Sequence, residues 1–171
     1  DVLACGGFKW LMGLAGTGFL YVNERARGLV APVAPGMFAA EHSFTALKFH
    51  DDARRYETGT TAYALLHGWA AGLGLLTEIG IENIALRNLH LTDRLIAGIQ
   101  DSQLRVLSAV ATPQERSAIV TFTAGSNDAN QTLYGRLEQA KVKVSLRGGS
   151  LRVSPNFFNT EAEIDRLLNV L

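Results

Sequence analysis

A lysine close to the start of the sequence could act as a nucleophile. Lys9 follows Gly6-Gly7-Phe8 and precedes Trp10, directly after a segment, Asp1–Cys5, that is typical of a short buried strand. Burial among apolar residues disfavours an ammonium ion, so a lysine in such a place becomes a usable amine. Such amines form Schiff bases with carbonyl compounds and with pyridoxal phosphate. The alternative, which the local sequence favours, is a strand-end lysine that reaches water.

A second candidate is the segment Glu57-Thr58-Gly59-Thr60, which directly precedes a predicted helix. Hydroxyl groups and free backbone N–H groups at a helix N-terminus bind phosphate well. Gly59 and Thr60 are therefore candidate phosphate ligands. The alternative is an ordinary helix cap, because threonine is favoured at that position.

A third candidate is Arg152, which lies in the apolar segment Leu151–Pro155. An arginine inside an apolar strand needs a partner or a ligand, and its guanidinium group can hold a carboxylate through two hydrogen bonds. An arginine on the solvent face of an edge strand is an equally good interpretation.

The cysteine and the histidines give little indication of a disulfide or a metal site. Cys5 is the single cysteine, so neither an internal disulfide nor a cysteine-rich metal site is expected. The histidines do not have the spacing of metal ligands on one helix, and no metal is expected. They are His42, His50, His67 and His90.

The hydrophobic pattern predicts the elements that carry these residues. Short strands are predicted at 1–5 and 17–22, and residues 23–58 are expected to be irregular. From residue 61 the pattern is two helices, two strands, a helix, two strands and a helix. The predicted ranges are 61–79, 81–99, 104–107, 118–123, 128–140, 142–146, 151–154 and a last helix after the capping pair Thr160 and Glu163. Pro113 is expected in a loop. This order favours a small α+β unit with a mainly antiparallel sheet covered by helices.

Composition limits the classes of function. The chain has 171 residues, 47% of them hydrophobic, and equal numbers of basic and acidic residues, 16 of each. A net charge of zero gives no electrostatic argument for nucleic acid or for an anionic membrane. No apolar run has the length of a membrane span, and no signal peptide is recognisable. A cytoplasmic protein is the expectation.

Four segments, in order, resemble the class V aminotransferase family of pyridoxal-phosphate enzymes, which includes cysteine desulfurases, kynureninases and isopenicillin N epimerase-like proteins. They are CGGFKWLMG (5–13), GTGFLYV (16–22), RRYETGT (54–60) and LRVSPNFFNTEAEID (151–165). The resemblance implies an α/β fold of the fold-type I class, here the end of the large-domain sheet followed by a small α+β C-terminal domain. Residues 1–50 would belong to the large cofactor-binding domain, and residues 51–171 to linking helices and the small domain.

The resemblance also implies roles for the three candidate sites. Lys9 resembles the lysine that forms a Schiff base with pyridoxal phosphate and later acts as the base at the substrate Cα. Gly59 and Thr60 resemble the segment that reaches the cofactor phosphate of the neighbouring subunit, so a homodimer is expected. Arg152 resembles the arginine that holds the α-carboxylate of an amino-acid substrate.

Departures from the family qualify this expectation. Family members are about twice as long, and the part that precedes the lysine strand holds the acid that pairs with the pyridine nitrogen. The segment Lys141–Ser150 lacks the reactive cysteine of desulfurases, and Asn156 stands where many relatives have histidine. We therefore expect a fragment of an enzyme that acts at the Cα atom of an amino acid by transamination, epimerisation or elimination, and that is closer to aminotransferases and epimerases than to desulfurases. The fragment alone should be inactive or nearly so, and its exposed apolar surface should cause association. The alternative is a non-catalytic remnant that serves dimerisation or binding.

Overall fold

The computed structural model describes residues 1–41 and 48–171, which form two compact units, Asp1–Glu78 and Ile79–Leu171. His42 lies outside the described residues. The predicted boundary at residue 50 refers to the two domains of a complete relative and stays a prediction. Within this chain, the compact units divide between Glu78 and Ile79.

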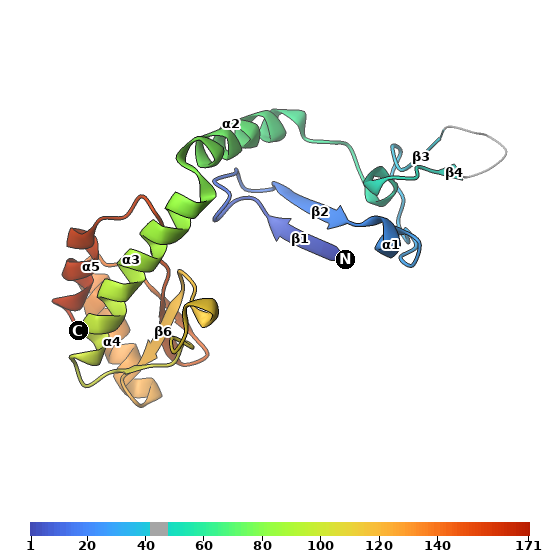
Figure 1. Cartoon of the computed structure of the whole chain (residues 1–171). Helices are drawn as coiled ribbons and strands as arrows, with labels where there is room; N and C mark the ends of the chain where they lie inside the picture. Colours follow the sequence, from blue (N-terminus) through green and yellow to red (C-terminus); the bar gives the residue numbers. More distant parts are fainter. Residues whose placement is uncertain (42–47) are drawn as a thin grey trace. The chain divides into compact units, whose positions relative to one another are not determined.

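The first unit begins with an antiparallel hairpin of β1 (Val2–Gly6) and β2 (Gly18–Val22), in which Val2 pairs with Val22 and Gly6 with Gly18 (Figure 1). The two predicted strands are thus confirmed. The predicted burial of the first strand is wrong, because β1 has exposed residues on both faces and only Cys5 is half-buried. Apolar, β-branched and aromatic residues favour the extended chain here, and most side chains of β1 and β2 are exposed.

Residues 23–58 are mainly irregular, as predicted, with four short elements in the described part. These elements are α1 (Glu24–Arg27), β3 (Ala40–Glu41), β4 (Lys48–Phe49) and the 3-10 helix η1 (Ala53–Tyr56). Side-chain caps explain two of them, since Asn23 accepts a hydrogen bond from the N–H of Ala26 and Asp52 accepts one from that of Arg54. The predicted long helix follows as α2 (Tyr63–Ile79).

The second unit has the predicted order of elements. It contains α3 (Ile81–Gln100), β5 (Arg105–Val106), the 3-10 helix η2 (Pro113–Glu115), β6 (Val120–Thr123), α4 (Asn127–Gln139), β7 (Ser145–Arg147), β8 (Ser150–Val153) and α5 (Glu161–Leu168). The loop predicted at Pro113 is in fact the 3-10 helix, which a capping box of Thr112 and Glu115 stabilises. The four strands form an antiparallel sheet in the order β5-β6-β8-β7.

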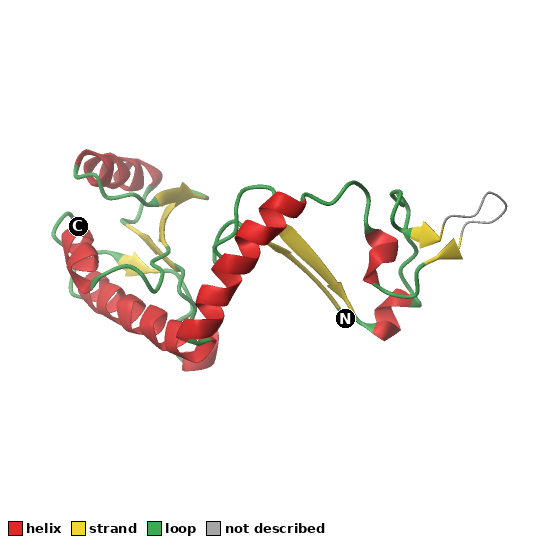
Figure 2. Ribbon diagram, turned by 90° about the horizontal axis from the view of Figure 1, so that it is seen from above, coloured by secondary structure: helices red, strands yellow, loops and turns green. Residues whose placement is uncertain are grey.

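One face of this sheet packs against all three helices of the unit, as Figure 2 allows the reader to follow. Strand residues alternate between faces, so Phe122 and its partner Leu151 both point into the core. The helices contribute apolar residues at helical spacing. The core consists of Leu91, Leu95, Ile99, Val120, Phe122, Leu133, Leu137, Leu151, Val153, Ile164 and Leu167. The opposite face of the sheet has no helix of this unit against it.

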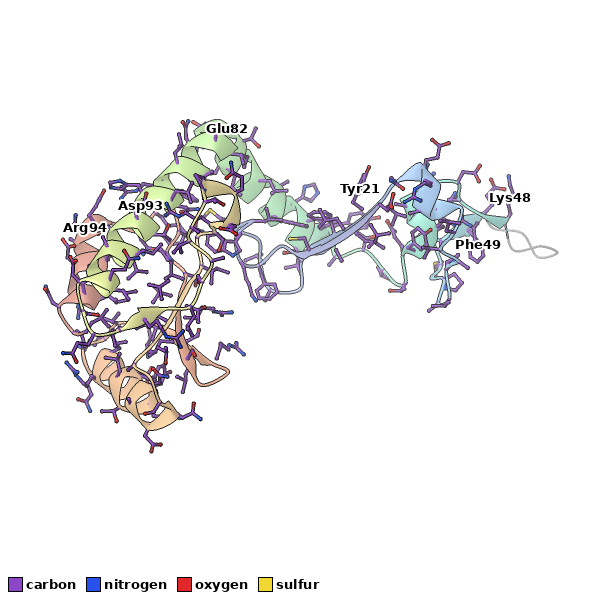
Figure 3. All side chains as sticks on the ribbon, turned by 60° about the horizontal axis from the view of Figure 1, so that its bottom comes forward. Tyr21, Lys48, Phe49, Glu82, Asp93 and Arg94 are labelled. Carbon is purple, nitrogen blue, oxygen red and sulfur yellow. The ribbon has the colours of Figure 1, made fainter. Side chains whose placement is uncertain are left out.

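Ion pairs on the surface join α3 to α5. Arg87 pairs with Glu161, and Arg94 pairs with Asp165. Figure 3 labels Arg94 beside Asp93, which pairs in turn with Arg116. These ion pairs therefore add polar contacts between α3 and α5 to the apolar contact that Ile164 and Leu167 of α5 make with the core.

Helix length and composition also bear on membranes. Within residues 1–41 and 48–171, no single helix combines the length and the apolar character that a membrane crossing requires. The helices α2 and α3 meet both requirements only when they are counted together across the break between them.

Candidate functional site

Lys9 lies in the connection between β1 and β2, which we call the lysine loop (residues 7–17). The lysine begins a turn, because the N–H of Met12 donates to its carbonyl oxygen over 3.1 Å. Its ammonium nitrogen lies 5.4 Å from the centre of the Phe8 ring. The side chain is exposed, which agrees with the favoured alternative of a strand-end lysine that reaches water and not with a buried amine. The expected position, directly after a strand, is confirmed.

Backbone hydrogen bonds and small residues fix the ends of the lysine loop. The N–H of Gly7 donates to Thr17 over 2.9 Å, and the N–H of Gly13 donates to Gly7 over 2.8 Å. The buried hydroxyl group of Thr17 donates to the carbonyl oxygen of Leu14 over 2.7 Å. Met12 has a positive φ of 53°, which is unusual for a residue with a side chain. The loop is therefore a defined turn in which each end is bonded to the other.

Sequence reasoning missed a residue beneath this loop. Trp69, on α2, is buried, and its indole N–H donates to the carbonyl oxygen of Leu11 over 3.0 Å. Its ring also stacks with that of Phe19 at 6.3 Å between centres. A tryptophan among the small residues of α2 was the signal, since a buried indole requires an acceptor for its N–H group.

Gly59 and Thr60 lie in an exposed, irregular segment between η1 and α2, with a bend at Gly59. Thr61 and Ala62 separate Thr60 from the first residue of the helix, Tyr63, so Thr60 is not the cap that the sequence indicated. The space around Gly59 is open, because a Cβ atom placed there would meet nothing within 4 Å. The backbone of Gly59 and the hydroxyl of Thr60 are therefore accessible to a ligand.

The same segment is held from behind by Gly36. The N–H of Gly36 donates to the carbonyl oxygen of Glu57 over 2.8 Å. A Cβ atom at Gly36 would lie 2.6 Å from the carbonyl carbon of Thr58, so only glycine allows this approach. The approach fixes one side of the segment and leaves the other side open.

Arg152 lies on β8, between β6 and β7, so it is not on an edge strand and that interpretation is wrong. Its neighbours Leu151 and Val153 point into the core, and Arg152 therefore points to the face without helices. On the adjacent strands, Thr121 and Ser145 are its register partners. The three half-buried residues form a polar row across the centre of the sheet.

The guanidinium group of Arg152 lacks internal partners for its inner nitrogen. Nε of Arg152 is buried and has no hydrogen-bond partner in the part of the chain that the structure describes. No carboxylate among these residues pairs with this arginine either, although other arginines of the unit do form such pairs. A buried donor without an acceptor is unfavourable, and a bound anion would supply the acceptor.

A cavity of about 440 Å³ lies beside Arg152. Basic side chains predominate among its charged residues, which are Lys141, Lys143, Arg152, Glu163 and Arg166. Lys143 pairs with Glu138, and Arg166 donates to the carbonyl oxygen of Ala140. Arg152 is thus the basic residue of the cavity with an unused buried donor.

The turn after β8 is rigid. The N–H of Asn156 donates to Oδ1 of Asn159 over 2.8 Å, and the N–H of Asn159 donates back to the carbonyl oxygen of Asn156 over the same distance. The buried amide of Asn88, on α3, reaches Asn156 at 3.5 Å. Asn156 therefore acts in this structure as a residue that fixes the turn.

The candidate residues divide between the two units. Lys9, Gly59 and Thr60 belong to the first unit, and Arg152 belongs to the second. Within the described residues, no hydrogen bond or ion pair joins Lys9 to Gly59 or Thr60. The same residues contain no group of three or more histidine, cysteine or acidic side chains placed to hold a metal ion. The candidate chemistry is an amine, an open phosphate-binding segment and a carboxylate-binding arginine.

Comparison with known proteins provides independent evidence. The family description "Aminotransferase class-V" matches residues 1–167. YcbU of Bacillus subtilis (strain 168), an uncharacterized aminotransferase, is 29% identical over 164 residues, which are 96% of this chain and 43% of the relative. Isopenicillin N epimerase of Streptomyces clavuligerus is 27% identical over 100% of this chain and 46% of its own length.

Solved structures show the same fold. The apo structure of a cysteine desulfurase from Thermococcus onnurineus NA1 matches with a TM-score of 0.87 and 23% identity, over 99% of this chain and 46% of that one. The chain thus spans less than half the length of these relatives, and it matches the C-terminal portion of cysteine desulfurase structures. The predicted α/β fold class and the resemblance to one family, with epimerase and desulfurase relatives, are confirmed.

Proposed function

This chain belongs to the class V aminotransferase family, and we propose that it supplies the lysine and the carboxylate-binding arginine of a pyridoxal-phosphate enzyme that acts at the Cα atom of an amino acid. The observation that carries the proposal is the buried, unpartnered Nε of Arg152 on an interior strand. Protein interiors rarely leave such a donor unused, and it therefore favours an anionic ligand over a structural role.

The residues present fit the cofactor that the family uses. Lys9 offers an exposed primary amine on a turn with fixed ends. Gly59 and Thr60 offer backbone and hydroxyl groups with open space in front of them, as a phosphate requires. Lys9 would hold the cofactor covalently, and Gly59 with Thr60 would hold a cofactor phosphate across a homodimer interface.

Each residue of this chain then has a defined task. When bound, pyridoxal phosphate supplies the electron sink that stabilises a carbanion at Cα. Arg152 binds the substrate carboxylate and so orients the bonds at Cα. The amine of Lys9 takes the proton from Cα or returns it, because a neutral amine is a base that can reach this position when it is not covalently engaged.

Among the reactions of the family, we favour transamination or epimerisation over desulfuration. Cys5 is the only cysteine of the chain and lies on β1, paired with Phe19. The turn between β7 and β8 contains Gly148 and Gly149 instead, both with positive φ. A sulfur-transfer reaction would require a nucleophilic thiol near the substrate, and no residue of Lys141–Ser150 supplies one.

Covalent trapping tests the role of Lys9. The purified chain, and the full product of its gene, are incubated with pyridoxal phosphate and reduced with borohydride, which fixes any imine between an amine and the aldehyde. Peptide mass mapping then measures the label on each of the four lysines, Lys9, Lys48, Lys141 and Lys143. We expect label mainly on Lys9, and none on that peptide in a Lys9→Ala variant.

A second variant tests Arg152 without relying on Lys9. Binding of a carboxylate such as acetate or an amino acid is followed by nuclear magnetic resonance at the backbone N–H groups of residues 151–153, which the parent and an Arg152→Lys variant both retain. We expect a shift that saturates with ligand in the parent and is absent in Arg152→Lys, because lysine cannot make the two-pronged contact. Equal labelling of all lysines together with no shift at Arg152 would refute the proposed function.

A further inference from the structure

We propose that Trp69 on α2 is the positioning residue of Lys9, and that Gly72 lets the helix approach the lysine loop closely enough for this. The proposal rests on the proposed function only for what Lys9 does. The position of the loop itself depends on contacts within the first unit alone.

The first contact is polar. The indole N–H of Trp69 donates over 3.0 Å to the carbonyl oxygen of Leu11, two residues beyond Lys9. Trp69 is only 6% exposed, so water cannot readily replace either partner. Breaking this bond would leave a buried donor or acceptor unpaired, which costs more than the bond itself contributes.

The second contact is steric and lies on both sides of Lys9. A Cβ atom on Gly7 would lie 2.7 Å from Cε2 and Cζ2 of Trp69, and one on Gly13 would lie 2.8 Å from Cδ1. The backbone before the lysine and the backbone after it therefore both rest on the same ring. Only glycine permits this approach without displacing a rigid side chain.

The third contact is one helical turn along α2. A Cβ atom on Gly72 would lie 2.9 Å from the carbonyl oxygen of Met12, the residue with positive φ in the loop. Residues three apart on a helix share one face, so Trp69 and Gly72 form a single platform. Gly74, on a different face of α2, would accept a Cβ atom with nothing within 4 Å.

These contacts concern the backbone around Lys9 and leave its amine exposed. A reacting group must be held within a fraction of an ångström to act efficiently, which requires a rigid backbone beneath it. The platform of Trp69 and Gly72 supplies this rigidity from the helix to the loop. The role is one of positioning, since neither residue touches the amine.

Matched variants test the proposal in the whole chain. Trp69→Phe removes the N–H group and keeps an aromatic ring, and Gly72→Ala pushes the loop away from α2. Gly74→Ala is the matched control, because it makes the same change in the same helix away from the loop. Two readouts are used, namely amide hydrogen exchange in residues 7–17 and the share of borohydride-fixed pyridoxal phosphate found on Lys9.

For Trp69→Phe and Gly72→Ala, we expect exchange at Gly7 and Gly13 to become faster by about tenfold. The share of label on Lys9 should fall severalfold relative to Lys48, Lys141 and Lys143. This loss of label should be confined to Lys9, whereas a change in general stability would alter the labelling of the other lysines as well. Gly74→Ala should leave both quantities unchanged.

Unchanged exchange in residues 7–17 of both variants would overturn the proposal, and so would equally faster exchange throughout residues 1–41 and 48–78. If the parent chain shows no preference for Lys9, the proposed function fails, while the exchange measurement still decides whether Trp69 positions the loop. If the parent prefers Lys9 and the variants do so equally, the positioning role alone is refuted.

Discussion

Residues 79–171 enclose a core of their own, whereas residues 1–78 leave most of their large apolar side chains exposed in the described structure. Phe122 and Leu151 are inaccessible to water in the second unit, whereas Leu3, Tyr21 and Val33 of the first unit are all more than half exposed, at 55%, 55% and 96%. The second unit has a sheet covered by three helices on one face. The hairpin of the first unit has no such cover.

The difference shows two ways of holding a candidate functional residue. The position of Arg152 is fixed by a continuous core that packs against its strand, β8. The position of the loop that carries Lys9 is fixed by one buried aromatic residue, Trp69, and by glycines that pack against Trp69. The position of Arg152 therefore depends on many close-packed contacts, whereas that of Lys9 depends on one or two residues.

The largest expected effect comes from truncating the second core. Phe122→Ala should lower the free energy of unfolding of residues 79–171 by about 3–5 kcal/mol, because it leaves a cavity among fully buried neighbours. Phe19→Ala, which removes a half-exposed ring stacked on Trp69, should cost about 1 kcal/mol. Amide hydrogen exchange in α3 and in β2 measures each unit separately. Equal losses in the two units would contradict the comparison.

A smaller effect is expected from a buried polar residue of the second unit. Asn130 donates to Thr123 and to the carbonyl oxygen of Gly149, and it accepts from the N–H of Ala124 over 2.7 Å. Asn130→Ala should cost about 2–3 kcal/mol, since it leaves these buried groups unpaired. Exposed Gln131 on the same helix is the control, and thermal unfolding of Gln131→Ala should match that of the parent.

Helix caps should produce a still smaller difference. Thr160→Ala removes the cap of α5 and should cost about 1 kcal/mol, whereas Thr160→Ser should retain most of the stability. Asn23→Ala removes the cap of α1, a helix of four residues, and its effect should stay local. Amide hydrogen exchange in β6 distinguishes the two caps, because only loss of the α5 cap should alter the exchange rates there. A change in β6 for the Asn23 variant would be inconsistent with independent units.

Acid should act on a tertiary ion pair in one unit and on a local one in the other. Arg87 lowers the pKa of Glu161 from 4.5 to about 2, and Arg54 lowers the pKa of Asp52 from 3.8 to about 2. A depressed folded-state pKa stabilises the fold above the unfolded-state pKa, and the contribution is lost as the pH falls toward 2.

Protonation of Glu161 should therefore loosen the contact between α3 and α5, whereas protonation of Asp52 should affect only η1. A nuclear magnetic resonance titration from pH 6 to about pH 2 follows both regions. Glu161→Gln should abolish the change in α5, and salt should weaken it because the pair is exposed. An acid response of α5 that persists in Glu161→Gln would show that another group is responsible.

The second unit could be predicted from sequence nearly element by element. The hydrophobic pattern predicted the helix at 81–99, in which Leu91, Leu95 and Ile99 are buried, and the cap of Thr160 with Glu163 marked the start of α5. These signals come from neighbouring residues in the sequence, and the packing of the unit's own core favours the same helices and strands. The η2 turn was missed because Pro113 serves both in loops and at the first position of a helix.

The candidate site was less predictable. Residue types identified Lys9, Gly59, Thr60 and Arg152 as candidates. The exposure of Lys9 agrees with the alternative of a strand-end lysine that reaches water, whereas the helix cap at Thr60 was wrong. Exposure depends on what packs over a segment, and the sequence of that segment does not contain this information. Trp69 was missed for a similar reason, since its role depends on a loop more than fifty residues away along the chain.

The place of α5 in the core has a consequence for biosynthesis. Among the elements of the second unit, α3 leaves the ribosome first and α5 last, yet Ile164 and Leu167 pack in one cluster with Leu91 and Leu95. The part of α3 that α5 covers therefore stays exposed until α5 has been synthesised. During that interval the nascent chain offers a binding surface for chaperones, and a ribosome that stalls before α5 would release a chain that cannot close its core.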